Sequence, residues 1–70
     1  MISYKRLWQK CEEKGITKYR LTEYYHMSRS LVWKLSHDMP VSANTLDRLC
    51  NILECRIEEI CEHIPDDNVF

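Results

Sequence analysis

The sequence contains no run of eighteen apolar residues, so no segment is predicted to span a membrane. Its N-terminus also lacks the features of a signal peptide, because Lys5, Arg6 and Lys10 interrupt it and no small-residue cleavage site follows. We therefore expect a cytoplasmic protein with no membrane partner. A chain of 70 residues is long enough for one small domain, which buries only about 60% of its unfolded surface and so needs a compact core.

No Cys-x-x-Cys pair is present among the four cysteines, which are Cys11, Cys50, Cys55 and Cys61. In a reducing cytosol they are expected as free thiols rather than disulfides. A zinc site is an alternative, because His37 and His63 could join Cys55 and Cys61. However, Cys50 and Cys61 fall on apolar faces of helical patterns, where cysteine behaves as a small hydrophobic residue. We expect no metal and no other cofactor.

The sequence also has little that favours an enzyme. No cysteine has a recognisable electropositive neighbourhood that would activate it as a nucleophile. A helical domain of this size offers few places for a cleft with convergent polar groups. We expect no catalytic residues and no small-molecule substrate.

No strand pattern, repeat or linker is apparent, whereas apolar residues recur at helical spacing along the chain. The first apolar stripe, Tyr4–Cys11, predicts a helix with Ser3 as its candidate N-cap and Gly15 at its end. Further helices are predicted from Lys18 to about Tyr25, from Arg29 to about Ser36, from the Ser42 cap through Leu53, and from Ile57 to Ile64 before Pro65. This pattern predicts an all-α domain of five helices over residues 1–65, followed by a flexible tail at residues 66–70.

Residues 17–35 (TKYRLTEYYHMSRSLVWKL) carry the clearest functional pattern. Thr17 and Ser28 can each accept a backbone N–H at the start of a helix, which leaves about three residues between the two helices. So short a connection makes the helices cross at a steep angle, as in a helix-turn-helix. At about 100° per residue, the second helix gathers apolar residues on one side and polar or basic residues on the other. The apolar side holds Leu31, Val32 and Leu35; the other side holds Arg29, Ser30, Trp33, Lys34 and His37.

Charge is divided unevenly between the two halves of the chain. Residues 1–37 hold eight basic and three acidic residues, a balance of +5, whereas residues 38–70 hold two basic and eight acidic residues, a balance of −6. The overall charge of −1 hides this asymmetry. We expect the basic half, which contains the helix-turn-helix, to approach phosphates, and the acidic half to face away.

The order and spacing of three segments resemble the phage-repressor (Cro/XRE) family of DNA-binding proteins. These segments are GITKYRL at 15–21, MSRSLVWKL at 27–35 and VSANTLDRLCNILECRIEEI at 41–60, and the resemblance extends over roughly residues 3–64. It implies a compact five-helix, lambda-repressor-like domain whose second and third helices form the helix-turn-helix. It also implies that the third helix, at about residues 29–36, enters the major groove of double-stranded DNA.

The resemblance assigns roles to matching positions. Lys18 stands where family members often contact phosphate or a base edge, and His37 stands where a polar residue commonly touches the DNA backbone. The groove-facing positions are occupied by Arg29, Ser30, Trp33 and Lys34, while Thr17 and Ser28 are caps with phosphate contact as a secondary role. Arginine at such a position can make a bidentate contact to guanine, and lysine is better suited to phosphate.

Three positions depart from the family pattern. Thr22 stands where a small alanine is usual, and Trp33 takes a place normally held by a small residue. His26 stands where the turn usually has a glycine with positive φ, a conformation that histidine adopts at a cost of about 1 kcal/mol.

Two functions remain as hypotheses. The first is a sequence-specific transcriptional regulator, of which a repressor is the type that the resemblance suggests, binding as a homodimer to an inverted repeat. The second is a protein-interaction module on a helix-turn-helix scaffold, with Trp33 and Leu31 as the anchor for a protein partner. Salt dependence separates them, because phosphate contacts weaken steeply as salt rises and an apolar contact does not.

Overall fold

The computed structural model describes residues 1–66. They form four α-helices, α1 (Lys5–Glu13), α2 (Lys18–Glu23), α3 (Arg29–Ser36) and α4 (Ala43–Leu53), one 3₁₀ turn, η1 (Ile57–Glu59), and two short strands, β1 (Ile2–Ser3) and β2 (Glu62–His63). Each helix in this part of the chain is too short and too polar to cross a lipid bilayer. Except for Asp66, the tail expected at 66–70 lies outside the described residues.

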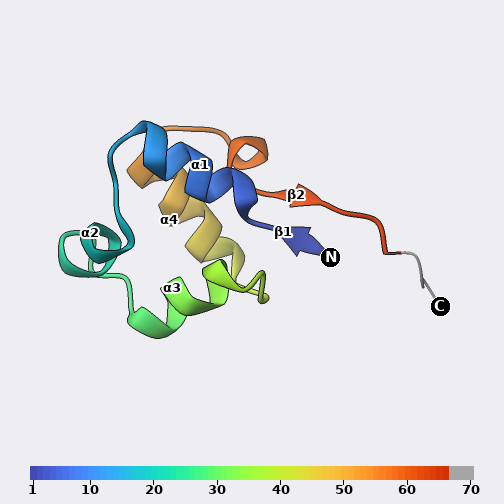
Figure 1. The fold of residues 1–70 in the computed structure, drawn as a ribbon, viewed down its shortest axis with the longest axis horizontal. Helices are drawn as coiled ribbons and strands as arrows, with labels where there is room; N and C mark the ends of the chain where they lie inside the picture. Colours follow the sequence, from blue (N-terminus) through green and yellow to red (C-terminus); the bar gives the residue numbers. More distant parts are fainter. Residues whose placement is uncertain (67–70) are drawn as a thin grey trace.

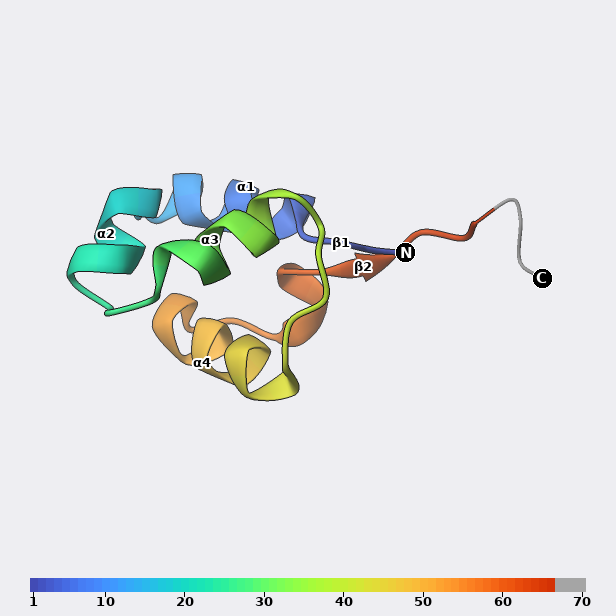
Figure 2. The same cartoon turned by 90° about the horizontal axis from the view of Figure 1, so that it is seen from below.

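The helices are arranged so that α2 lies at one end of the molecule and the paired strands lie at the other, with α1, α3 and α4 between them (Figure 1). In the view turned by 90°, α1 and α4 lie on opposite sides of α3 (Figure 2). Strand β1 pairs antiparallel with β2, with Ile2 opposite His63 and Ser3 opposite Glu62. The two ends of the described chain therefore meet at the strand end, far from α2.

The core is formed by the apolar stripes predicted from the sequence. Six aliphatic side chains are completely buried, namely Leu7, Leu21, Leu35, Leu49, Leu53 and Ile60. They come from all four α-helices and from the residue that follows η1, so every α-helix supplies part of one core. Burial of such a side chain contributes about 1.5–3 kcal/mol, and this single core fixes the orientation of α3.

Three of the four α-helices end in the same way, with a left-handed residue and a hydrogen bond from the next residue back to a carbonyl five positions earlier. The left-handed residues are Gly15 (φ 69°), Asp38 (φ 53°) and Glu54 (φ 50°). The matching backbone bonds are Ile16 to Cys11 at 2.8 Å, Met39 to Lys34 at 2.9 Å and Cys55 to Cys50 at 3.1 Å. This is the Schellman pattern of helix termination, and only its glycine was predicted.

Asp38 has a second role that offsets its strained conformation. Its Oδ1 accepts the backbone N–H of Tyr4 at 2.9 Å, just before α1 begins. The end of α3 is thereby tied to the start of α1, which sets the position of α3 relative to the rest of the domain.

The prediction of a fifth helix is wrong, and so is the prediction that no strand is present. The segment expected as a helix from Ile57 to Ile64 forms only the 3₁₀ turn η1 and then strand β2. This segment is short for a helix and contains β-branched isoleucines, so its intrinsic helical preference is small. It gains more by pairing with the N-terminus, where the Ile64 N–H also donates to the Met1 carbonyl at 2.8 Å.

Ser3 is not the N-cap of the first helix. It lies in β1, and α1 begins after Tyr4, which makes no side-chain cap. The Oγ of Ser3 still accepts the N–H of Lys5, at 3.3 Å. The predicted boundaries of the other helices agree with the structure to within about two residues.

Candidate nucleic-acid interface

The helix-turn-helix is formed by α2, a five-residue connection and α3. Both expected caps are confirmed: Thr17 Oγ1 accepts the N–H of Arg20, and Ser28 Oγ accepts the N–H of Leu31, each at 3.1 Å. His26 has a φ of 60°, as expected for the turn. Because the two caps fix where each helix begins, the start of α3 is set by the sequence itself.

Two contacts hold the connection in place, one to α2 and one to α4. The N–H of Met27 donates to the Leu21 carbonyl at 3.0 Å, and the Met27 side chain is buried in the core. Arg48, on α4, donates from its guanidinium to the carbonyl of Tyr25. The turn is therefore bound to α4 as well as to α2, so α3 cannot swing freely relative to the core.

The two sides of α3 differ as the helical spacing predicts. Val32 and Leu35 are buried, and Leu31 is half-buried against the core. The opposite side, which we call the outer face of α3, is exposed and consists of Arg29, Ser30, Trp33, Lys34 and His37. The helix thus presents one continuous polar and aromatic surface to solvent.

The cations of the outer face have no acidic partner within the part of the chain that the structure describes. Among residues 1–66, neither Arg29 nor Lys34 takes part in an ion pair. Their charges are therefore available to an external anion, and Arg29 is additionally at the start of α3, where the helix dipole favours negative ligands.

Lys18 reaches the same region from the start of α2. Its Nζ lies 4.8 Å from the centre of the Trp8 ring, and the half-buried Trp8 ring donates from Nε1 to the Leu35 carbonyl at 3.4 Å. Lys18 also lines a groove of about 300 Å³ between α2 and α3, together with Tyr19, Thr22, Glu23, Arg29 and Val32. The groove brings Lys18 and Arg29 together, although they are eleven residues apart in sequence.

Trp33 and His37 form a stacked pair at the middle of the outer face. Their ring centres are 4.1 Å apart with an angle of 22° between the planes. His37 Nδ1 also lies 2.8 Å from the Trp33 carbonyl, to which it donates. The helical spacing of the sequence predicts that both residues lie on this face. Their contact was not predicted, although an i, i+4 spacing on a helix is a signal for such a contact.

A scan against protein-family models matches residues 6–66 to the Cro/C1-type HTH DNA-binding domain. The chain belongs to this family. Among solved structures, the chain is similar to the transcriptional regulator VanUg, whose crystal structure (form II) aligns with a TM-score of 0.84 and 31% sequence identity. That alignment covers 93% of this chain and 87% of the VanUg chain. No curated protein gives a significant match.

The first of the three departures from the Cro/C1-type pattern, Thr22, has its hydroxyl satisfied by a hydrogen bond. The Thr22 hydroxyl donates to the Tyr19 carbonyl at 2.8 Å, so its polar group is satisfied within α2.

Glu23, which lines the groove next to Lys18 and Arg29, was not singled out from the sequence. A carboxylate there can accept from the exocyclic amine of cytosine, which is how acidic side chains contact base edges.

The cysteines do not form part of this surface. Among the described residues no group of three or more His, Cys, Asp or Glu side chains is placed to hold a metal ion, so the zinc alternative has no site there. Burial raises the pKa of the Cys11 thiol to about 11, with a smaller contribution from nearby Cys55. Cys11 is therefore protonated at neutral pH and packs as an apolar side chain, as expected.

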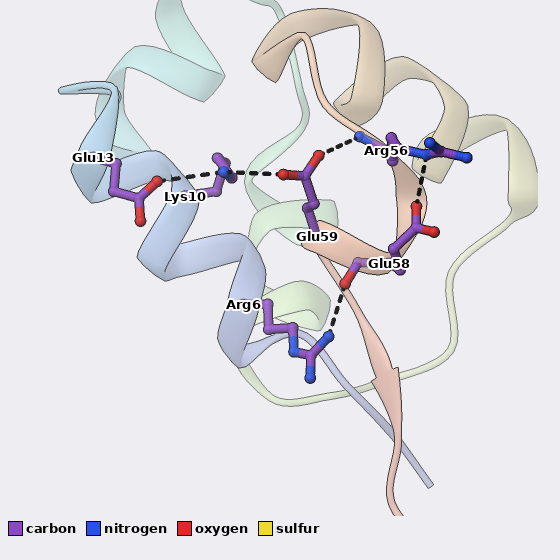
Figure 3. Close-up of polar contacts among 6 residues, drawn as sticks. All are labelled: Arg6, Lys10, Glu13, Arg56, Glu58 and Glu59. Atoms are coloured by element: carbon purple, nitrogen blue, oxygen red, sulfur yellow. Dashed lines mark hydrogen bonds and ion pairs between the residues drawn. The ribbon is translucent and has the colours of Figure 1, made fainter.

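The region where α1 meets η1 carries a different set of charges (Figure 3). On α1, Lys10 Nζ lies 3.4 Å from both Glu13 and Glu59, and Arg6 donates to the Glu58 carbonyl at 2.9 Å (Figure 3). Glu59 in turn accepts the backbone N–H of Arg56 at 2.7 Å. These contacts attach η1 to α1, so the basic residues of α1 are partly neutralised.

Proposed function

We propose that this protein is a sequence-specific transcriptional regulator, acting as a repressor, that inserts α3 into the major groove of DNA. The observation that carries this proposal is the outer face of α3, an exposed helix face whose cations have no acidic partner among residues 1–66. Membership of the Cro/C1-type HTH DNA-binding family supports it, as does the similarity to a transcriptional regulator.

The proposed contacts divide into those that select a sequence and those that position the protein. Arg29 is suited to a bidentate contact with guanine, and Ser30 and Trp33 are placed beside it on the same face. Phosphates are the proposed partners of Lys18, Lys34 and His37, and of the exposed caps Thr17 and Ser28. Phosphate contacts supply affinity and register but little sequence information.

We propose further that the protein binds as a homodimer to an inverted repeat. A single module of this size buries about 600–1,000 Å² against DNA, which is a small interface for strong operator binding. Two copies related by a twofold axis would place their α3 helices in successive major grooves, about 34–36 Å apart.

The experiment is a selection of bound sequences from a random duplex DNA library, followed by affinity measurements on the selected DNA at increasing salt. We expect an inverted repeat and an affinity that falls by orders of magnitude between about 50 and 200 mM salt. Arg29→Ala should weaken binding by roughly 1–3 kcal/mol and relax the preference at one position of each half-site. Recovery of no motif would overturn the proposal.

Arg56→Ala provides the matched control. Arg56 is also an exposed arginine, but its Nε pairs with Glu58 at 3.3 Å on η1, away from α3. Both variants remove one positive charge, so a general effect of net charge would weaken both equally. We expect only Arg29→Ala to lose sequence preference.

The second candidate function is a protein-interaction module. The observation that favours it is the exposure of Trp33, of which 55% is accessible to solvent. Leu31 does not join it in a common patch, because it is half-buried on the side of α3 that packs against the core. A binding partner held by Trp33 alone would be insensitive to salt, which the same titration tests.

A further inference from the structure

The middle of the outer face of α3 is aromatic rather than charged. At about 100° per residue, Trp33 and His37 project between Arg29 on one edge of the exposed arc and Lys34 on the other. The cations therefore flank the aromatic pair. A helix that enters the major groove turns its exposed arc toward the base edges, so Trp33, in the middle of this arc, faces the bases together with Arg29.

The aromatic pair is preassembled in the protein. The imidazole of His37 stacks on the Trp33 indole with ring centres 4.1 Å apart, and its Nδ1 donates to the carbonyl of Trp33 at 2.8 Å. His37 is thus attached to the same residue through both its ring face and its hydrogen bond. An exposed tryptophan would otherwise sample several rotamers, and restricting it in advance lowers the entropy lost on binding.

The chemistry of the major groove restricts what such a pair can contact. The base edges there present hydrogen-bond donors and acceptors, and their one apolar group is the C5-methyl of thymine. An indole face pressed against the polar edge of guanine, cytosine or adenine would leave that edge without partners, which is costly. Contact with a methyl group instead removes apolar surface of both partners from water.

We infer that Trp33, held in place by His37, recognises the C5-methyl group of a thymine at a fixed position in each half-site. This inference rests on the proposed function and adds to it the base that the aromatic pair selects. Trp33 is then a specificity-determining residue, and His37 acts through Trp33 as a positioning residue.

The test uses the DNA sequence obtained from the selection and replaces each thymine, one at a time, with deoxyuridine. This substitution removes only the methyl group and leaves base pairing unchanged. For the wild-type protein we expect binding to weaken roughly three- to fivefold at one thymine of each half-site. The Trp33→Ala variant should bind the methylated sequence more weakly and should no longer distinguish thymine from uracil at that position.

Tyr24→Ala is the matched control for Trp33→Ala. Tyr24 is also a large exposed aromatic residue, with 64% of its surface accessible, but it lies at the end of α2 and not on α3. Its replacement should leave the discrimination between thymine and uracil unchanged. Circular dichroism of both variants shows whether each has folded.

The role of His37 is tested by the same discrimination ratio. His37→Ala should reduce the preference for thymine to about twofold, because Trp33 is no longer restrained. His37→Phe, which keeps the stacked ring, should restore it. If His37 contacts only a DNA phosphate, His37→Ala will lose the same factor of affinity for the thymine DNA and for the uracil DNA, and its binding will depend less on salt. That result would overturn the positioning role.

The outcomes separate this inference from the proposed function. The inference would be overturned if an inverted repeat is selected and the wild-type protein binds it equally well after each single replacement of thymine by uracil. The proposed function as a regulator would then still stand. Equal sensitivity of the wild-type protein and Trp33→Ala to the missing methyl would also overturn it. Failure to select any sequence would overturn both proposals.

Discussion

Two regions of the molecule use their basic residues in different ways. Where α1 meets η1, Arg6 and Lys10 contact acidic side chains or carbonyls of the C-terminal segment. On the outer face of α3, Arg29 and Lys34 have no acidic partner within residues 1–66. The first group stabilises the fold, whereas the second is available to a ligand.

The ion pairs of Arg6 and Lys10 with the C-terminal segment change the interpretation of the charge asymmetry in the sequence. The +5 balance of residues 1–37 includes Arg6 and Lys10, which the structure assigns to internal contacts with η1 and β2. The acidic half does not simply face away from the basic half, because part of it neutralises α1. The basic residues of α2 and α3 take part in no ion pair among residues 1–66 and can attract phosphates, so the local arrangement of charge matters more than its sum.

The largest expected effect distinguishes the two faces of α3. Leu35 is completely buried, so Leu35→Ala should lower the free energy of unfolding by about 2–5 kcal/mol through lost burial and the cavity left behind. Trp33→Ala, two residues away on the outer face, should change it by only about 0.5 kcal/mol. Urea unfolding followed by circular dichroism measures both. A comparable loss in the two variants would show that Trp33 stabilises the fold.

A smaller effect on stability is expected from replacing Arg6, which lies where α1 meets η1. Arg6 lies 3.0 Å from Glu62 and also donates to the Glu58 carbonyl, so Arg6→Ala should lower the free energy of unfolding by about 0.5–1 kcal/mol. Its affinity for the selected DNA should stay within about twofold of the wild type, because Arg6 lies away from α3.

Arg29→Ala should behave in the opposite way, with weaker DNA binding and nearly unchanged stability. Arg6→Lys, which keeps the charge but not the forked geometry, shows how much of the effect depends on the guanidinium. Equal losses of DNA affinity in Arg6→Ala and Arg29→Ala would contradict the division of the molecule into two kinds of charged region.

The helix-turn-helix could be predicted from the sequence because its signals are local. Ser28 and Thr17 mark helix starts within three residues of the N–H groups that they accept, and the spacing of Val32 and Leu35 defines the buried side of α3. The positive φ of His26, in contrast, was expected from the family resemblance and not from a local signal. Signals of this kind depend only on neighbouring residues, so no knowledge of the rest of the fold is needed.

The C-terminal segment could not be predicted in the same way because its structure depends on distant partners. The periodic isoleucines predict a helix from Ile57, but the segment instead pairs with residues 2–3, about sixty positions earlier in the chain. Asp38 likewise has a distant partner, because its Oδ1 accepts the backbone N–H of Tyr4. Non-local pairing of this kind leaves no periodic pattern in the sequence.

The smallest expected effect is a dependence of stability on pH that arises where η1 contacts α1. The backbone N–H of Arg56 donates to Glu59 and, together with Lys10, lowers the pKa of that carboxyl below its ordinary value of 4.5. A pKa that is lower in the folded protein means that the stabilisation is present above 4.5 and is lost as the pH falls through the folded value. The attachment of η1 to α1 should therefore weaken in acid.

Urea unfolding midpoints measured from about pH 6 to about pH 3 test this effect. Glu59→Gln cannot ionise, so its midpoint should be lower than that of the wild type near neutral pH and should fall less on acidification. Glu12→Gln is the matched control, because Glu12 is exposed on α1 and forms no ion pair among residues 1–66. If the wild type and Glu59→Gln lose stability in parallel on acidification, Glu59 does not secure η1 through its charge. In that case η1 is held against α1 by apolar contacts with the core.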